Sequence, residues 1–337
     1  MLVRAAMILL LSWVLAGCGG EGKSRREAPG NPSDVVQPAL PDYWPTSAWQ
    51  DGDIAAPDLE LTTNDFFADI MADYDPADGR RSIRFRDVLE MRSGLDWNEA
   101  EDLALFTVMH VFVRDPTCTD NLTLTVCSLL RRPLAHAPGS AWNYNTYDSY
   151  LLAAFFWHLT GVSLADYARQ ELLSPMGITL EEEDWSQWPF PDDNNAYTFG
   201  GGLSRYRTRD LARIGLLTLY NGQWDGQQLV SPEWLALSTA PIGEGAVVRF
   251  DGAGVPSLST EDIRYGMQWW TRTGPSFSGP DALTARGLGG QYILVFPEQA
   301  LVVVATHHFS ESDTPVDRTT GLVAFLQSQV IDQLVVP

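Results

Sequence analysis

The hydrophobic pattern of this chain changes once along its length, from a helical period to short strands. Between about residues 85 and 220, apolar residues recur at the spacing of buried or amphipathic helices. Beyond Ile263, short apolar runs are bounded by turn residues such as Pro297-Glu298. Helices in the middle and an antiparallel meander at the end predict an α+β fold.

Several of the predicted elements have recognisable ends. The helix expected at Phe85–Met91 stops at Ser93-Gly94, and the helix expected at Tyr147–Leu159 ends at Gly161. Ser163 and Asp166 form a capping box for the next helix, which Pro175 and Gly177 close. Thr208 is the expected cap of a fourth. The stretch that contains Cys118 and Cys127 is predicted to be rich in loops. The expected helices are Phe85–Met91, Tyr147–Leu159, a short helix after Ser163, Arg209–Tyr220 and an amphipathic Val316–Leu334, and the expected strands are Tyr265–Thr271, Gln291–Phe296 and Leu301–Thr306.

Composition restricts both the class of protein and its partners. A chain of 337 residues with 45% hydrophobic residues is long enough to bury one core, or two lobes around one cleft. The net charge of −21 argues against nucleic acid, whose phosphates require a basic surface, and against polybasic attachment to anionic lipid. No motif predicts a cofactor.

The first residues contain a short apolar run that ends in a cysteine. Arg4 precedes an apolar run that is too short to span a bilayer and has the form of a secretory signal. The run ends in Leu15-Ala16-Gly17-Cys18, which resembles the lipobox of bacterial lipoproteins, and this implies lipidation of Cys18. We therefore expect a signal peptide over 1–17, a flexible lipidated tether over 18–42, and a folded domain over 43–337 on the outer side of the cytoplasmic membrane.

Cysteine and histidine usage favours a disulfide over a metal site. With Cys18 lipidated, Cys118 and Cys127 remain as a pair that an oxidising compartment allows to bridge, the alternative being two free thiols. No pair of residues has the spacing of metal ligands, so no metal is expected. His307 and His308 are adjacent on a predicted strand and point to opposite faces. His158 lies on an apolar helix and is interpreted as a packed histidine.

Five blocks of sequence occur in a fixed order along the chain: Ser82–Trp97, Pro138–Thr146, Leu172–Ile178, Gly200–Leu203 with Thr208–Arg213, and Gly289–Tyr292 with Phe296–Glu298. In this order they resemble the β-lactamase-related serine hydrolases, which include class C β-lactamases, penicillin-binding esterases and 6-aminohexanoate-dimer hydrolases. The resemblance spans roughly residues 75 to 335. It implies a β-lactamase/transpeptidase-like fold, in which an antiparallel sheet has flanking helices and a helical lobe.

The family's first catalytic element, Ser-x-x-Lys, is missing. One helical turn places the lysine of that motif against the serine hydroxyl, where it acts as a base. Lys23 is the only lysine in this chain, and it lies in the predicted tether. Tyr43–Ser47 resembles an early family segment and Asp65 a point after the Ser-x-x-Lys helix, so the intervening strands and helix are predicted to be deleted. A damaged or misread gene would give the same sequence.

The other two elements are retained in part. Tyr144-Asn145-Thr146 resembles the segment that presents the family's catalytic tyrosine, although an aromatic wall residue is an equally good interpretation of Tyr144. The final strand motif, often Lys-Thr-Gly or His-x-Gly, is here Leu288-Gly289-Gly290-Gln291, whose leucine supplies neither charge nor proton. The glycines still permit a ligand to approach the backbone. These seven residues are the predicted lining of a cleft.

Three hypotheses for function follow. The first is a catalytically degenerate serine hydrolase. The second is an active esterase, amidase or β-lactam hydrolase that uses another nucleophile, or whose missing segment was lost in reading the gene. The third is an envelope lipoprotein that binds a small ester or amide, a cell-wall peptide, or another protein. Gly-x-Ser-x-Gly, the mark of the other large class of serine hydrolases, is absent.

Overall fold

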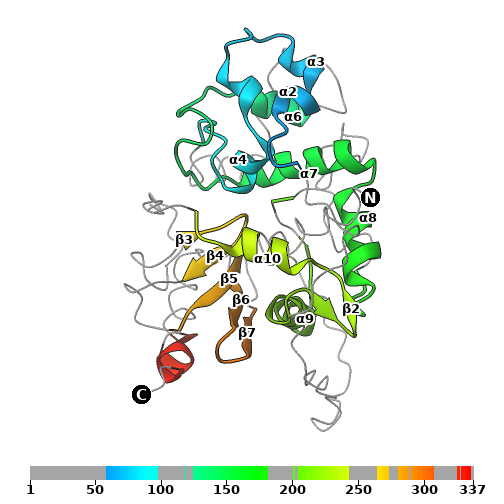
Figure 1. Cartoon of the computed structure of the whole chain (residues 1–337), viewed down its shortest axis with the longest axis vertical. Coiled ribbons are helices and arrows are strands. Elements are labelled where there is room, and N and C mark those ends of the chain that lie inside the picture. The colour runs from blue at the N-terminus through cyan, green and yellow to red at the C-terminus, as the bar shows by residue number, and fades with distance from the viewer. Residues whose placement is uncertain are drawn as a thin grey trace, which may run out of the picture.

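The structure is a computed structural model, and it describes residues 58–97, 118, 124–180, 200–201, 204–242, 264–272, 280–287, 290–306, 325–326 and 328–334. A helical lobe lies at one end of the molecule and an antiparallel sheet at the other (Figure 1). This is the predicted α+β arrangement. Residues 1–57, which include the predicted signal, tether and early family segment, lie outside the described residues.

The helical lobe is built from short helices around one long one. Its elements are α2 (Thr63–Phe66), α3 (Ala68–Met71), a 3-10 turn (Gly79–Ser82), α4 (Phe85–Leu89), α6 (Leu124–Leu130) and α7 (Thr146–Thr160). Next come α8 (Leu164–Ala168), a π-helical turn (Arg169–Leu173), α9 (Thr208–Leu219), a two-stranded ribbon of β1 (Gln223–Trp224) and β2 (Gln227–Gln228), and α10 (Pro232–Thr239).

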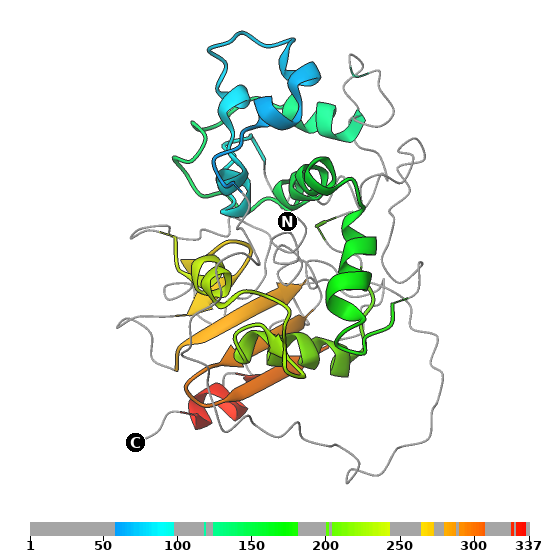
Figure 2. The ribbon, with the colours of Figure 1, turned by 45° about the vertical axis from the view of Figure 1, so that its right-hand side comes forward.

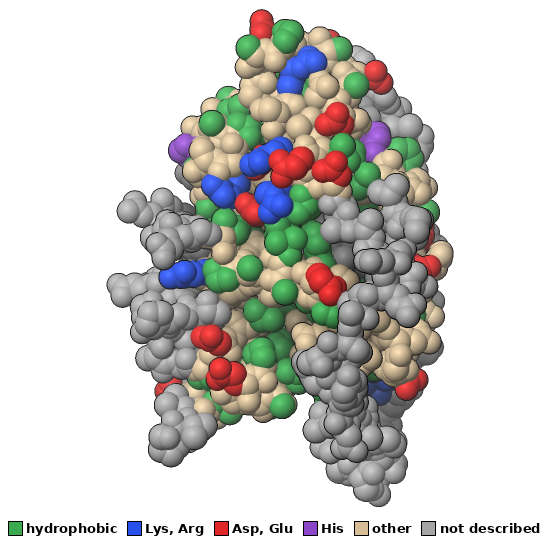
Figure 3. Space-filling model, in the orientation of Figure 1, with side chains coloured by type: hydrophobic (Ala, Val, Ile, Leu, Met, Phe, Trp, Pro, Cys, Tyr) green, Lys and Arg blue, Asp and Glu red, His purple; other side chains and the backbone are tan. Residues whose placement is uncertain are grey.

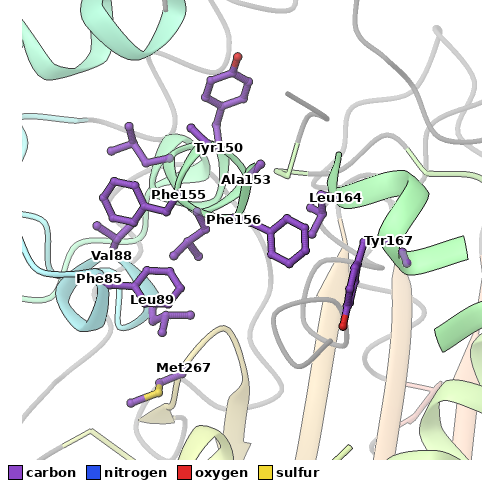
Figure 4. Packing of buried hydrophobic residues seen from close by; sticks show 14 of the residues in the cluster. Phe85, Val88, Leu89, Tyr150, Ala153, Phe155, Phe156, Leu164, Tyr167 and Met267 are labelled. Atoms are coloured by element: carbon purple, nitrogen blue, oxygen red, sulfur yellow. The ribbon is translucent and has the colours of Figure 1, made fainter. Parts of the chain in front are cut away.

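Helix α7 is the centre of the lobe because it is apolar on every side. All of its residues from Thr146 to Phe156 are buried. The ring of Phe155 stacks on Phe66 of α2 at 4.4 Å between centroids and lies 5.7 Å from Phe85 of α4 (Figure 4). A helix that is apolar all round must be enclosed by other elements. The short helices α2 and α4 therefore form the cover of α7.

Five antiparallel strands form the sheet in the order β3-β4-β5-β6-β7. Helix α9 packs on one face, and Ile331 and Leu326 of the C-terminal segment pack on the other (Figure 2). A Cβ atom added to Gly215 of α9 would lie 2.5 Å from Val302 Cγ1, so the helix approaches the sheet at a point that accepts only glycine. The strands are β3 (Arg264–Tyr265), β4 (Trp270–Arg272), β5 (Ala282–Gly287), β6 (Gln291–Phe296) and β7 (Leu301–Ala305).

Most predicted helices and strands are confirmed, with small changes at their ends. Ser163 Oγ accepts from the Asp166 backbone N–H, as the capping box requires. Thr208 is the first residue of α9 and not its cap, and its hydroxyl pairs with that of Thr306 at 2.8 Å. The terminal helix was predicted too long, because residues 331–333 form a 3-10 turn.

Two predictions of local structure were wrong, and two elements were missed. Tyr265–Thr271 is not one strand but a tight hairpin, with Tyr265 paired to Trp270. The loop-rich stretch around the cysteines contains helix α6, and the predicted Cys118–Cys127 disulfide is present. Strand β5 and helix α10 were not predicted, although Ser231-Pro232 is a good helix start: Ser231 Oγ accepts from the Trp234 N–H at 3.1 Å.

Gln268, at the turn of the β3–β4 hairpin, joins the sheet to the helical lobe. Its backbone N–H and its Nε2 both donate to Leu89 O at the end of α4, at 3.2 and 3.1 Å. Its Oε1 accepts from Ser149 Oγ of α7 at 2.9 Å. Gln268 is buried and has a φ of 64°, so these contacts hold it in a conformation that side chains rarely adopt.

We expect Gln268→Ala to reduce the free energy of unfolding by about 1–3 kcal/mol, because Ser149 Oγ then loses its buried acceptor. Chemical denaturation measures this change. Gln227→Ala, at an exposed position of β2, is the matched control and should change stability by less than about 0.5 kcal/mol. Equal effects from the two substitutions would show that Gln268 does not join the lobe to the sheet.

Candidate active site

The segment that carries Tyr144 is held by the chain that follows α4. Gly139 N–H donates to Arg92 O at 2.8 Å, and Asn143 N–H donates to Met91 O at 2.9 Å. The Arg92 guanidinium donates back to Gly139 O. Gly139 has a φ of +74°, and a Cβ there would also meet Asp87 and Arg84. Two of the blocks quoted for the family resemblance therefore lie side by side.

An ion-pair network holds the first of these blocks in place. Asp87 is buried, and its carboxylate accepts from Arg84 Nη2 at 2.7 Å and from Arg84 N at 2.9 Å. The carboxylate of Asp87 in turn raises the pKa of Arg84. Glu60 pairs with Arg84 and Arg86 at the surface, where Figure 3 shows acidic and basic side chains together on the helical half.

Tyr144 lies in a cluster of aromatic rings that joins the helical lobe to the sheet. Its ring is 5.4 Å from Trp270 of β4, 6.3 Å from Tyr265 of β3 and 6.3 Å from Trp142. Met91, with a φ of 57°, is buried in the same cluster. Tyr144 itself is half-buried. The retained tyrosine is thus part of an aromatic wall that lies between the lobe and the sheet.

The two residues after Tyr144 serve mainly to start helix α7. Asn145 is buried and caps the helix: its Oδ1 accepts from the N–H groups of Tyr147 and Asp148 at 2.8 and 3.3 Å. Asn145 Nδ2 lies 3.1 Å from Asp148 Oδ1. Thr146 is the first helical residue and is also buried. The predicted role of Asn145 and Thr146 in lining the cleft stays a prediction, and their structural role is to fix where Tyr144 points.

The strand motif lies at the turn between β5 and β6. Gly290 has a φ of +92°, and Gln291 is the buried first residue of β6, opposite Gly287. Leu288 and Gly289 lie outside the described residues. Tyr144 is connected to this turn through the sheet. Its ring contacts Trp270, Trp270 is paired with Thr284 of β5, and β5 leads into the turn.

Arg286 is a residue of this region that the sequence analysis missed. It lies on β5 between Thr284 and the turn, and its guanidinium is 5.5 Å from the ring centre of Trp270 and 6.0 Å from that of Tyr292. Burial lowers the pKa of Arg286 and raises the pKa of Tyr292. The sequence shows this arginine directly before Gly287, but strand β5 was not predicted, and so neither was the burial of its side chain.

The serines Ser93 and Ser149 of these segments form hydrogen bonds within the fold, and neither has a lysine nearby in the sequence. Ser149 donates to Gln268, and Ser93 Oγ accepts from the Leu95 N–H at 3.3 Å.

Burial raises the pKa of Glu90, while Arg92 and Arg86 lower it. Within the described residues there is no cluster of three or more residues of metal-ligand type, and no helix long and apolar enough to cross a membrane. His158 packs edge-on against Phe67 at 5.0 Å, and burial lowers its pKa.

Comparison with known proteins agrees with this arrangement. A family model described as Beta-lactamase matches residues 32–327. The chain belongs to the β-lactamase family. No curated protein sequence matches it. The match to the β-lactamase family begins at residue 32, within the segment that the sequence predicts to be a tether.

Solved structures of similar proteins confirm the β-lactamase/transpeptidase-like fold. A protein named as a 6-aminohexanoate-dimer hydrolase from Bacillus anthracis has a TM-score of 0.54 and 19% identity, over 83% of this chain and 68% of its own. EstCE1, a hydrolase with promiscuous acyltransferase activity, has a TM-score of 0.54 and 16% identity, over 79% of this chain and 78% of its own. A D-stereospecific amidohydrolase from Streptomyces has a TM-score of 0.52 and 15% identity, over 80% and 79%.

Proposed function

We propose that this chain is a catalytically degenerate member of the β-lactamase family that binds a small ester, amide or cell-wall peptide at the bacterial cell envelope. The observation that carries this proposal is the count of lysines: the only one is Lys23, which lies outside the described fold. In the family's chemistry, the lysine takes the proton of the serine nucleophile. No residue of the described domain has an ε-amino group to replace it.

Loss of the lysine is expected to lower the rate of catalysis strongly. Removing a member of a nucleophile–base unit typically lowers kcat by about 10⁶. Tyr144 remains, but a phenol alone does not replace the amine that activates the serine nucleophile in this family. The strand motif has Leu288 where relatives often have lysine or histidine, and leucine cannot replace that charge. Binding energy in the cleft is the part of the family's function that the remaining residues support.

Two observations support the class of ligand that we propose. Two of the similar structures are named for amide chemistry, as a 6-aminohexanoate-dimer hydrolase and a D-stereospecific amidohydrolase. Trp142, Tyr144, Tyr265 and Trp270 supply ring faces and edges, which bind apolar groups well. A short acyl or peptidyl group packed on these rings fits both observations.

Acylation by mechanism-based reagents tests this proposal. We expect that the protein produced without residues 1–18 shows no increase in intact mass after treatment with penicillin or a fluorophosphonate. An active β-lactamase-family enzyme treated in parallel is the positive control. Stoichiometric acylation that maps to one serine would contradict the proposal, and Tyr144→Phe would then show whether the retained tyrosine takes part.

Attachment to the membrane through Cys18 is tested separately. We expect cells that express the full chain to incorporate labelled palmitate into it, and the Cys18→Ser variant to take up none. Cys127→Ser is the matched control and should retain the label, since that cysteine is bonded to Cys118. Equal labelling of the wild type and Cys18→Ser would rule out the lipid anchor at this position.

A further inference from the structure

Strand β7 is an open edge of the five-stranded sheet (Figure 1). It pairs with β6 on one side, and no other strand of the described residues pairs with its outer side. Every residue of β6 is buried, whereas the residues of β7 are all half-buried. Alternate residues of an edge strand point their backbone N–H and C=O groups away from the sheet, where the sheet itself offers them no partner.

The exposure of β7 lies along its edge, because other elements cover both of its faces. On one face the strand packs on α9, where Val302 lies close to Gly215. On the other face Val303 packs against the cluster that contains Leu326 and Ile331. The uncovered part of β7 is therefore its outer backbone and the adjoining flank of its side chains.

The two edges of the sheet differ in their protection. Strand β3, at the far edge, has only two residues, and one of them is Arg264. A short edge strand with a charged residue is a common defence against pairing with another chain. Strand β7 has the sequence Leu-Val-Val-Val-Ala, without charge, proline or glycine. An apolar edge without this defence is suited to pairing with a strand of another molecule.

We infer that β7 is a dimer interface, at which the β7 strands of two copies of this chain pair antiparallel about a two-fold axis. A strand that meets its own copy in this way presents the same surface on both sides, as a symmetric dimer requires. The three valines of β7 favour cross-strand pairs of this kind. Because the strand carries no charge, two chains of net charge −21 meet there without like charges in contact.

The dimer joins the two sheets into one and is remote from the aromatic cluster of each copy. Val303 is the middle residue of β7, so the two-fold axis passes near it and Leu301 of one copy faces Ala305 of the other. Tyr144 contacts β3 and β4, at the opposite edge of the sheet. Dimer formation therefore depends neither on the proposed ligand nor on catalysis.

Light scattering after size-exclusion chromatography tests the interface on the full chain in detergent, because it separates the mass of the polypeptide from that of the detergent. We expect the mass of two chains. A monomer at every concentration would overturn the inference, whether another segment of this chain or a different protein then covers the β7 edge. Open-ended aggregates in place of a dimer would also contradict it.

Val303→Lys places two ammonium groups next to each other across the two-fold axis. We expect this variant to have a dissociation constant about a hundredfold or more above that of the wild type, because like charges that face each other in an interface oppose association. Val303→Thr is the matched control, since it has nearly the shape of valine and no charge, and it should remain a dimer. A Val303→Lys chain that dimerises as the wild type does would refute a β7 interface.

A mixing experiment separates loss of the interface from misfolding. Val303→Lys and Val303→Glu should each be monomeric alone and form a mixed dimer when combined in equal amounts, since the facing charges are then opposite. Circular dichroism checks that each variant is folded. Two folded, monomeric variants that form no mixed dimer would show that Val303 does not lie at the axis, against the inference. If neither variant folds, the mass of the wild-type chain decides alone.

These masses involve no turnover and no ligand. A monomeric wild type would leave the degenerate-hydrolase proposal standing, and acylation of a serine would leave the dimer standing.

Discussion

The contact between Gln268 and the end of α4 fixes the relation of the two halves of this molecule. One residue at the turn of a short hairpin supplies two donors to Leu89 O and one acceptor to Ser149 Oγ. Because Gln268 directly precedes Trp269 and Trp270, its position sets the position of the aromatic wall. Tyr144 meets Trp270 and Tyr265 because α4, α7 and the β3–β4 hairpin are joined at this point.

The chemistry of the β-lactamase family separates into parts that this chain keeps and parts that it lacks. The fold, the segment around Tyr144 and the glycine turn before β6 belong to the first group. A lysine within the described fold belongs to the second, because Lys23 is the only lysine of the sequence. A cleft wall is stabilised by many packing contacts, whereas proton transfer depends on one amine. The loss of catalysis that we propose, with retention of the wall, would therefore be a small change in structural terms.

The sequence predicted the family, the α+β class and the long helices, because α7 and α9 have strong hydrophobic patterns and marked ends. It did not predict the hairpin at Tyr265–Trp270, because Gly266 is the one local sign of a turn in an otherwise strand-like run. Contacts from Leu89 and Ser238, distant in sequence, decide that conformation. Tyr144 was found by motif. Arg286 was missed because only the folded sheet shows that its guanidinium is buried, without a hydrogen-bond partner among the described residues.

Binding without turnover is the central claim, and nuclear magnetic resonance measures both on one sample. A short N-acyl amino acid methyl ester and its free acid are mixed with stoichiometric protein, saturation transfer reports which of them is bound, and the ester signal reports hydrolysis. The account predicts saturation transfer to the ester or to its free acid, with ester loss no faster than in buffer. Rapid loss of the ester at an enzymatic rate would contradict it.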